Sequence, residues 1–120
     1  MASTLYKLTA DIGAEFNLDI RHKDSDGVLF DYSTGFTMRF VMMTAVGGTD
    51  IFDETSPNAD FVLSDGAGDT ANISISIGKT LTSLWLAQNA VYELLIWPDA
   101  ATDEVNIPIK GEFIIRAGLL

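Results

Sequence analysis

Strict alternation of apolar and polar residues in two early segments is the feature that most limits what this chain can fold into. The segments are residues 14–22 and 36–40, and polar residues separate their apolar members. The apolar members are Phe16, Leu18, Ile20, Phe36, Met38 and Phe40. Because successive side chains of a strand point to opposite sides, each segment has one apolar and one polar face. This pattern is typical of an antiparallel sheet that buries one face.

Strand-like segments recur along the whole chain and are separated by turn residues. They are residues 4–9, 14–22, 36–43, 49–53, 60–64, 70–77, 91–97 and 105–116. We expect Leu5 to face inward, and Gly47-Gly48 predicts that 49–53 pairs back on 36–43 as a hairpin. Short strands with turns about every 8–12 residues predict one all-β domain, an antiparallel, immunoglobulin-like β-sandwich of about seven or eight strands over residues 1–120. An open barrel is the alternative.

One segment has helical periodicity. Leu81, Leu84 and Trp85 are spaced as i, i+3 and i+4, which places them on one stripe of a helix. Thr80 is a candidate N-cap. We therefore predict one short helix near residues 80–88 that closes an end of the core.

Charge and composition exclude several classes of function. The chain has 17 acidic and 7 basic residues and a net charge of −10, which disfavours nucleic acid and anionic membrane surfaces as partners. It contains no cysteine, which excludes disulfides, thiolate zinc sites and a cysteine nucleophile. No apolar run approaches the about 20 residues of a membrane helix, and the N-terminus does not resemble a signal peptide. We expect a protein made in a cytoplasm, without nucleic-acid or membrane partners.

No constellation of residues indicates catalysis or metal binding. His22 is the only histidine, so a multi-histidine metal site is excluded. Residues 78–80 (Gly-Lys-Thr) resemble the end of a phosphate-binding loop, but Ile73 stands where that loop requires its first glycine. Calcium loops that begin at Asp24 or Asp65 lack the glutamate at the twelfth position. We therefore expect no enzyme activity, no cofactor and no metal.

Two predicted strands, 36–43 and 91–97, are apolar on both faces. A strand of this kind is covered on both sides. Either the helix or a long loop covers the second face, or that face contacts another protein. The candidate contact residues, which include the two C-terminal leucines, are Val41, Met43, Leu95, Trp97, Leu119 and Leu120.

The order of these motifs resembles that of a family of phage proteins. The first run is Tyr6, Gly13, Phe16, Leu18, Ile20, Asp26-Gly27, Asp31, Gly35 and Arg39. An acidic glycine turn at 64–69 follows, and the last run is Tyr92, Leu94, Ile96, Gly111, Phe113 and Ile115. Small tail and baseplate modules share this order, and they are best known as the N-terminal domain of phage baseplate upper proteins.

The resemblance implies a non-enzymatic structural protein of the virion. Such a module is an adaptor that connects the tail core to fibre or receptor-binding components. Its partners would be other tail or baseplate proteins, and tail symmetry implies a homo-oligomer or three or six copies. The resemblance also implies location in the tail or baseplate after synthesis in the host cytoplasm.

A carbohydrate- or receptor-binding module of a phage tail, on the same fold, is the alternative function. Such a site needs exposed aromatic side chains beside polar groups, and Tyr6, Tyr32 and Trp97 are the candidates. A host-encoded secreted domain is disfavoured because cysteine and a signal peptide are lacking.

Overall fold

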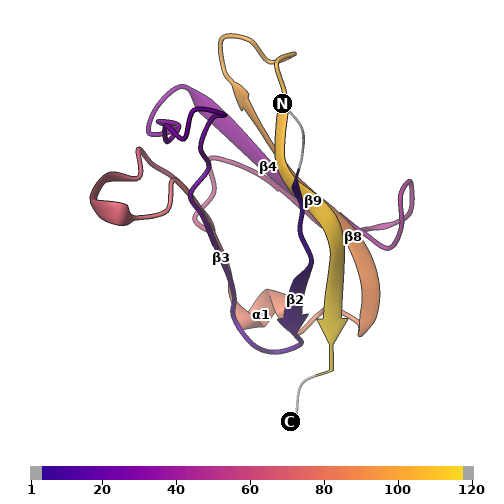
Figure 1. Ribbon diagram of the computed structural model, residues 1–120. Coiled ribbons are helices and arrows are strands. Elements are labelled where there is room, and N and C mark those ends of the chain that lie inside the picture. Colours follow the sequence, from indigo (N-terminus) through magenta and orange to yellow (C-terminus); the bar gives the residue numbers. More distant parts are fainter. Residues whose placement is uncertain (1–3, 118–120) are drawn as a thin grey trace.

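The computed structural model describes residues 4–117 as two β-sheets around one core (Figure 1). The six-stranded sheet consists of β1 (Thr4–Leu5), β2 (Leu8–Asp11), β4 (Phe36–Met43), β5 (Asp50–Thr55), β8 (Gln88–Pro98) and β9 (Asn106–Arg116). The three-stranded sheet consists of β3 (Phe16–Ile20), β6 (Phe61–Leu63) and β7 (Ile73–Ile77).

The strand order is that of an immunoglobulin-like sandwich. One sheet runs β1-β9-β8-β4-β5, with β2 also beside β9, and the other runs β3-β7-β6. The strands β1 and β2 pair with β9 in parallel, whereas β4 and β5 form the predicted antiparallel hairpin. The predicted all-β, immunoglobulin-like sandwich is therefore confirmed. The open barrel is not formed, because no strand of residues 4–117 belongs to both sheets.

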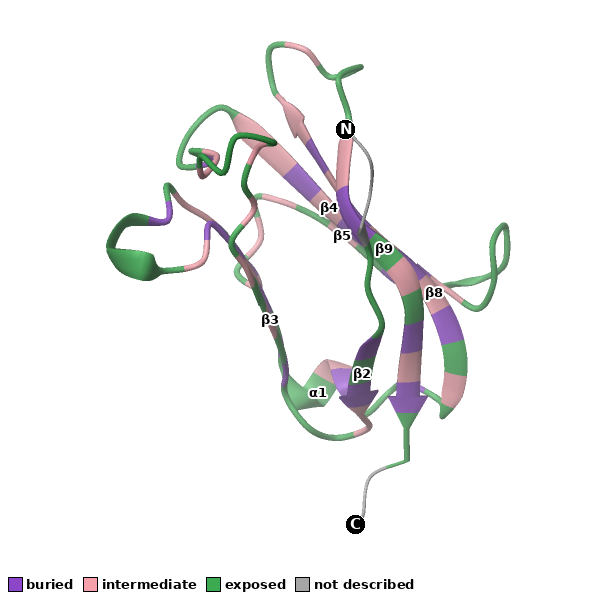
Figure 2. Cartoon of the chain, viewed as in Figure 1, coloured by how far each residue is buried: buried purple, intermediate pink, exposed green. Residues whose placement is uncertain are grey.

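Aromatic rings fill the space between the sheets and group around Phe113. The centroid of the Phe113 ring lies 5.1 Å from that of Phe16, 6.0 Å from that of Trp85 and 6.1 Å from that of Tyr92. Buried and more exposed positions alternate along β8 and along the C-terminal part of β9 (Figure 2). The inward-facing residues of β8 are Ala90, Tyr92, Leu94 and Ile96. The alternation read from the sequence thus defines the core face of this sheet.

The predicted helix is much shorter than residues 80–88. Helix α1 spans Lys79–Thr82, its N-cap is Gly78 rather than Thr80, and Leu84 is 76% exposed. The chain must leave the helix early because β8 already begins at Gln88. The Thr82 hydroxyl donates a hydrogen bond of 2.8 Å to the Ala14 carbonyl, which holds α1 against the turn before β3. As predicted, the helix lies at one end of the core (Figure 1).

The predicted first strand is divided at Tyr6. The Tyr6 amide donates to the Lys110 carbonyl at 2.9 Å, and the Tyr92 hydroxyl donates to the Tyr6 carbonyl at 2.6 Å. Gly111 has φ +147°, and a Cβ built there would lie 3.0 Å from the Tyr6 oxygen. The missing side chain therefore lets the Tyr6 backbone pass close to β9. Leu5, which we predicted to face inward, is 77% exposed, because the register of β1 places it on the solvent side.

Asn72 connects the three-stranded sheet to the long loop between β3 and β4. Its side chain is fully buried, and its Nδ2 donates to the carbonyls of His22 and Phe30, both at 2.9 Å. Its Oδ1 accepts from the His22 amide at 2.8 Å. Residues 70–72 were predicted as strand, but β7 begins at Ile73, and the 3-10 turn η1 (Ala67–Asp69) precedes it.

Candidate functional site

A groove of about 500 Å³ crosses the outer face of the six-stranded sheet. Its floor is formed by Val41 and Met43 of β4 and Val91 of β8, and Leu5 and Val46 stand at its rim. These five apolar residues define what we call the outer-face groove. The charged side chains of Glu93 and Lys110 also line the groove, as do Gly47, Tyr92 and Gly111.

The register of the strands explains why these residues meet. Val41 is paired with Glu93, and Met43 with Val91, across the β4–β8 ladder. Glu93 is in turn paired with Lys110 across the β8–β9 ladder. Because the positions between them point into the core, all these side chains point outward. A register irregularity at Met43 accompanies the turn into the hairpin that carries Val46.

The rim of the groove exposes large apolar side chains to solvent. Val46 is 93% exposed and Leu5 is 77% exposed, whereas Val41 on the floor is only 9% exposed. Contiguous apolar surface around a concave floor is characteristic of protein-binding sites, because its removal from water stabilises a complex.

A charged border lies on one side of the groove. The Arg39 guanidinium binds both carboxylate oxygens of Asp53, and its Nε donates to Oδ1 at 2.8 Å. Hydrogen bonding to Arg39 lowers the pKa of Asp53, and the same bonds raise the pKa of Arg39. The pair joins β4 to the edge strand β5 and keeps both side chains charged. Glu93 is near enough to Arg39 to raise the guanidinium pKa further.

The structure brings together only some of the predicted contact residues. Val41 and Met43 lie in the outer-face groove. Leu95 and Trp97 lie on the same face of β8 and are half-buried, but they do not line the groove. Leu119 and Leu120 are outside the described residues.

Of the two elements that we expected as covers of the second apolar face, the helix and a long loop, the helix does not cover it. Helix α1 lies at the end of the core, where the Trp85 ring that follows it contacts Phe52 and Phe113. The loop between β4 and β5 instead brings Val46 to the rim of the groove. Sequence reasoning missed Val46. It precedes Gly47-Gly48, a pair that predicts a turn, and nothing in the sequence indicated that this turn lies beside a binding surface.

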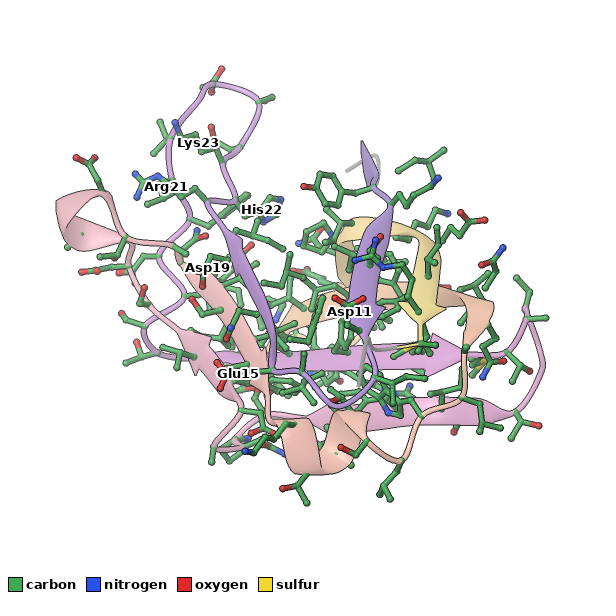
Figure 3. The ribbon with its side chains drawn as sticks, turned by 90° about the horizontal axis from the view of Figure 1, so that it is seen from below. Asp11, Glu15, Asp19, Arg21, His22 and Lys23 are labelled. Carbon is green, nitrogen blue, oxygen red and sulfur yellow. The ribbon has the colours of Figure 1, made fainter. Side chains whose placement is uncertain are left out.

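Burial removes Tyr32 from the three aromatic candidates for a carbohydrate site. Tyr32 is 2% exposed and its ring is stacked against Phe30, and burial raises its pKa. Tyr6 is 53% exposed and lies beside β9, on the other sheet from a hollow of the three-stranded sheet. That hollow, of about 700 Å³, is lined by polar and small residues without an aromatic ring. Asp19 and Arg21, which Figure 3 labels on and just after β3, belong to its lining, and the Arg21 guanidinium donates to the carbonyls of Gly66 and Thr70.

His22 follows β3 and packs against aromatic side chains. Its Nδ1 lies 2.7 Å from the Tyr32 hydroxyl, and its ring packs against Phe30 with centroids 4.7 Å apart. Among residues 4–117, no group of three or more His, Cys, Asp or Glu side chains is arranged to hold a metal ion. Within the same range, the structure contains no helix of the length and apolar character needed to cross a membrane.

Partial burial of His22 predicts a pH-dependent stability. Burial lowers the pKa of His22 below its ordinary value of 6.5, so the unfolded state binds more protons than the folded state near that pH. The stabilisation relative to the unfolded state is present above about pH 6.5 and is lost as the pH falls through the lowered pKa. We expect the free energy of unfolding of the natural chain, minus that of His22→Gln, to decrease between about pH 7.5 and 5.

Urea unfolding of both proteins at several pH values measures this difference. The subtraction removes the contributions of the carboxylates, including Glu54, whose pKa is raised by burial and which acts in the opposite direction. A difference that stays constant over the whole pH range would show that the two states of His22 have the same pKa.

The comparisons with known proteins found distant structural similarity to solved structures. No protein-family model matches the chain, and no curated protein matches it. One similar chain comes from a photo-crosslinking study of multimeric cell-adhesive interactions of VGSC beta subunits. It is 12% identical, with a TM-score of 0.48 over 95% of this chain and 92% of that one.

A second similar chain comes from the crystal structure of ICOS in complex with ICOS-L and an anti-ICOS-L VNAR domain. It is 10% identical, with a TM-score of 0.48 over 97% of this chain and 56% of that one. Likeness of this degree carries no argument about function, and the strand order by itself defines the fold as immunoglobulin-like.

Proposed function

We propose that this protein is a non-enzymatic interaction module that binds another protein chain through the outer-face groove. The observation that carries the proposal is the exposure of Val46 and Leu5 beside a concave apolar floor. Solvent-exposed apolar side chains are ordinary when they are scattered singly. Here they are gathered at one groove, which is the arrangement that a partner protein covers.

We further propose that the module is a structural adaptor of a phage tail or baseplate, which connects the tail core to fibre or receptor-binding components. The support is the order of motifs that resembles the N-terminal domain of baseplate upper proteins. Within that order, Gly13, Gly27 and Gly35 all have positive φ, between +79° and +82°. Each of these motif glycines therefore adopts a backbone conformation that favours glycine. Their spacing in the motif corresponds to three turns of the chain.

The assembly context follows from the same resemblance. An adaptor on the axis of a tail would be present in three or six copies, in contact with other tail or baseplate proteins of the virion. The acidic surface of the chain, with its net charge of −10, would keep it soluble before assembly. The alternative carbohydrate-binding function has less support, because Tyr32 is buried and no aromatic ring lines the polar hollow.

The position of Val46 at the rim of the outer-face groove predicts that Val46→Asp weakens partner binding. A carboxylate on the rim would have to lose water in the complex, and we expect at least a tenfold weaker affinity, which corresponds to about 1.4 kcal/mol. The measurement mixes the purified chain, over a range of concentrations, with individually purified phage tail proteins and determines the fraction in complex by size-exclusion chromatography with light scattering.

Val28→Asp is the matched control for this experiment. Val28 is also a loop valine and is 61% exposed, but it lies in the loop after β3 and does not line the groove. The control should bind the partner as the natural chain does. Equal binding by both variants would show that the groove is not the contact, and the absence of a complex with every tail protein would contradict the adaptor function.

A further inference from the structure

We infer that a second copy of this chain binds in the outer-face groove, with the two sheets face to face about a two-fold axis that pairs Glu93 of each copy with Lys110 of the other. The inference rests on the proposed function, because it names a partner for the same groove. Two observations carry it, namely the two charges in the groove that form no ion pair in the described residues and the smaller acidic excess on this face.

Glu93 and Lys110 are neighbours that do not neutralise each other. They are directly paired across the β8–β9 ladder and both line the groove. Among residues 4–117, however, the ion pairs are Lys7–Glu112, Arg39–Asp53 and Arg116–Asp11, and Glu93–Lys110 is not one of them. Glu93 lies near enough to Arg39 to act on its charge, but neither Glu93 nor Lys110 forms an ion pair among residues 4–117, so both can pair with a second molecule.

A two-fold axis through the groove satisfies both groups at once. In a contact with two-fold symmetry, every contact occurs twice. If one residue of the first copy meets another residue of the second copy, the same two residues also meet with the copies exchanged. Glu93 of one copy would meet Lys110 of the other, and Lys110 of the first would meet Glu93 of the second. The arrangement needs no third component to balance the charges.

The charge of this face permits the approach of an identical, acidic molecule. Lys7, Arg39, Lys110 and Arg116 are four of the seven basic residues of the chain, and each lies beside an acidic residue on or next to the outer face. Asp50 also acts on Arg39 at this face, so a small acidic excess remains, but most of the 17 acidic residues lie elsewhere together with the other three basic residues. Two copies therefore repel each other less at this face than at the acidic turns.

The apolar rim of one groove can also pack on the apolar floor of an identical groove. Leu5 and Val46 project from the rim, and Val41, Met43 and Val91 form a concave floor. In a face-to-face dimer, the projecting side chains of each copy cover the apolar floor of the other. The exposed area of Leu5 and Val46 is then removed from water on both copies.

A charge exchange between two variants tests this geometry. We expect the natural chain to dimerise, and Glu93→Lys and Lys110→Glu each to weaken dimerisation at least tenfold, because each places like charges together. An equimolar mixture of the two variants restores opposite charges at both contacts, so it should form a one-to-one heterodimer. Sedimentation equilibrium gives the dissociation constants, and thermal unfolding verifies that both variants are folded.

Several results would overturn the inference. A natural chain that stays monomeric up to about 1 mM would exclude a stable dimer. Dimers of each single variant as tight as the natural dimer, or a mixture that stays monomeric, would exclude the Glu93–Lys110 pairing. A monomer that still forms a Val46-dependent complex with a tail protein would overturn only the second copy as partner. A dimer that binds no tail protein would instead overturn only the adaptor function.

Discussion

Asn72→Asp is expected to reduce the free energy of unfolding by at least about 3 kcal/mol. The substitution keeps the shape of the side chain but removes the two hydrogen bonds that Nδ2 donates to the carbonyls of His22 and Phe30. It also places a carboxylate against those two carbonyl oxygens at a site with no solvent exposure. Urea unfolding at neutral pH measures the loss.

Asn89→Asp is the control for the Asn72 prediction. Asn89 is an exposed residue of β8, so the same change of charge should alter stability by no more than about 0.5 kcal/mol. The deficit of Asn72→Asp should shrink at low pH, because a protonated carboxyl group regains one donor. Equal small losses for the two variants would show that the buried amide does not hold the loop after β3.

Gly111→Ala is expected to destabilise the protein by about 2–4 kcal/mol. Gly111 has φ +147°, which side-chain-bearing residues rarely adopt, and the new methyl group would lie 3.0 Å from the Tyr6 oxygen and 3.4 Å from the Tyr6 nitrogen. The backbone of Tyr6 must then move away from β9, which weakens its hydrogen bonds to Lys110 and Tyr92. Thermal and urea unfolding measure this effect.

Gly78→Ala provides the matched comparison. A Cβ at Gly78 meets no atom within 4 Å, and its φ is −70°. We expect a change within about 1 kcal/mol. A loss at Gly111 no larger than that at Gly78 would mean that the chain accommodates a side chain beside Tyr6.

The Gly111 contact also matters for the outer-face groove. Leu5 of β1 is paired with Lys110, the residue immediately before Gly111. Displacement of Tyr6 would therefore move Leu5, which stands at the rim of the groove. We expect Gly111→Ala to weaken partner binding as well as stability, whereas Gly78→Ala leaves binding unchanged.

Local periodicity accounts for the elements that could be predicted from the sequence. The segment 36–43 is the whole of β4, and 105–116 differs from β9 by one residue at its start. In such strands the burial of every second side chain appears directly in the order of residues. The helix prediction was too long because its apolar spacing was real only in part, since Trp85 is buried and Leu84 is exposed.

Sequence reasoning located only part of the candidate site. Val41 and Met43 could be identified because they break the alternation of their own strand. Leu5 was assigned to the wrong face. Its strand has two residues, which is too short for an alternating pattern to show which side faces the core. The role of Asn72 had no local signal at all, since its partners lie 50 and 42 residues away.

The order of residues by itself determined that this chain forms an acidic, all-β sandwich, because alternation, turn glycines and net charge are properties of single segments or of the whole composition. Only the tertiary structure decided which apolar face remains open. That outcome depends on register between β4, β8 and β9, and on the distant residues Leu5 and Val46 that rise beside the floor. Contacts between segments that are far apart in the chain are set by packing of the folded molecule, and no single segment encodes them.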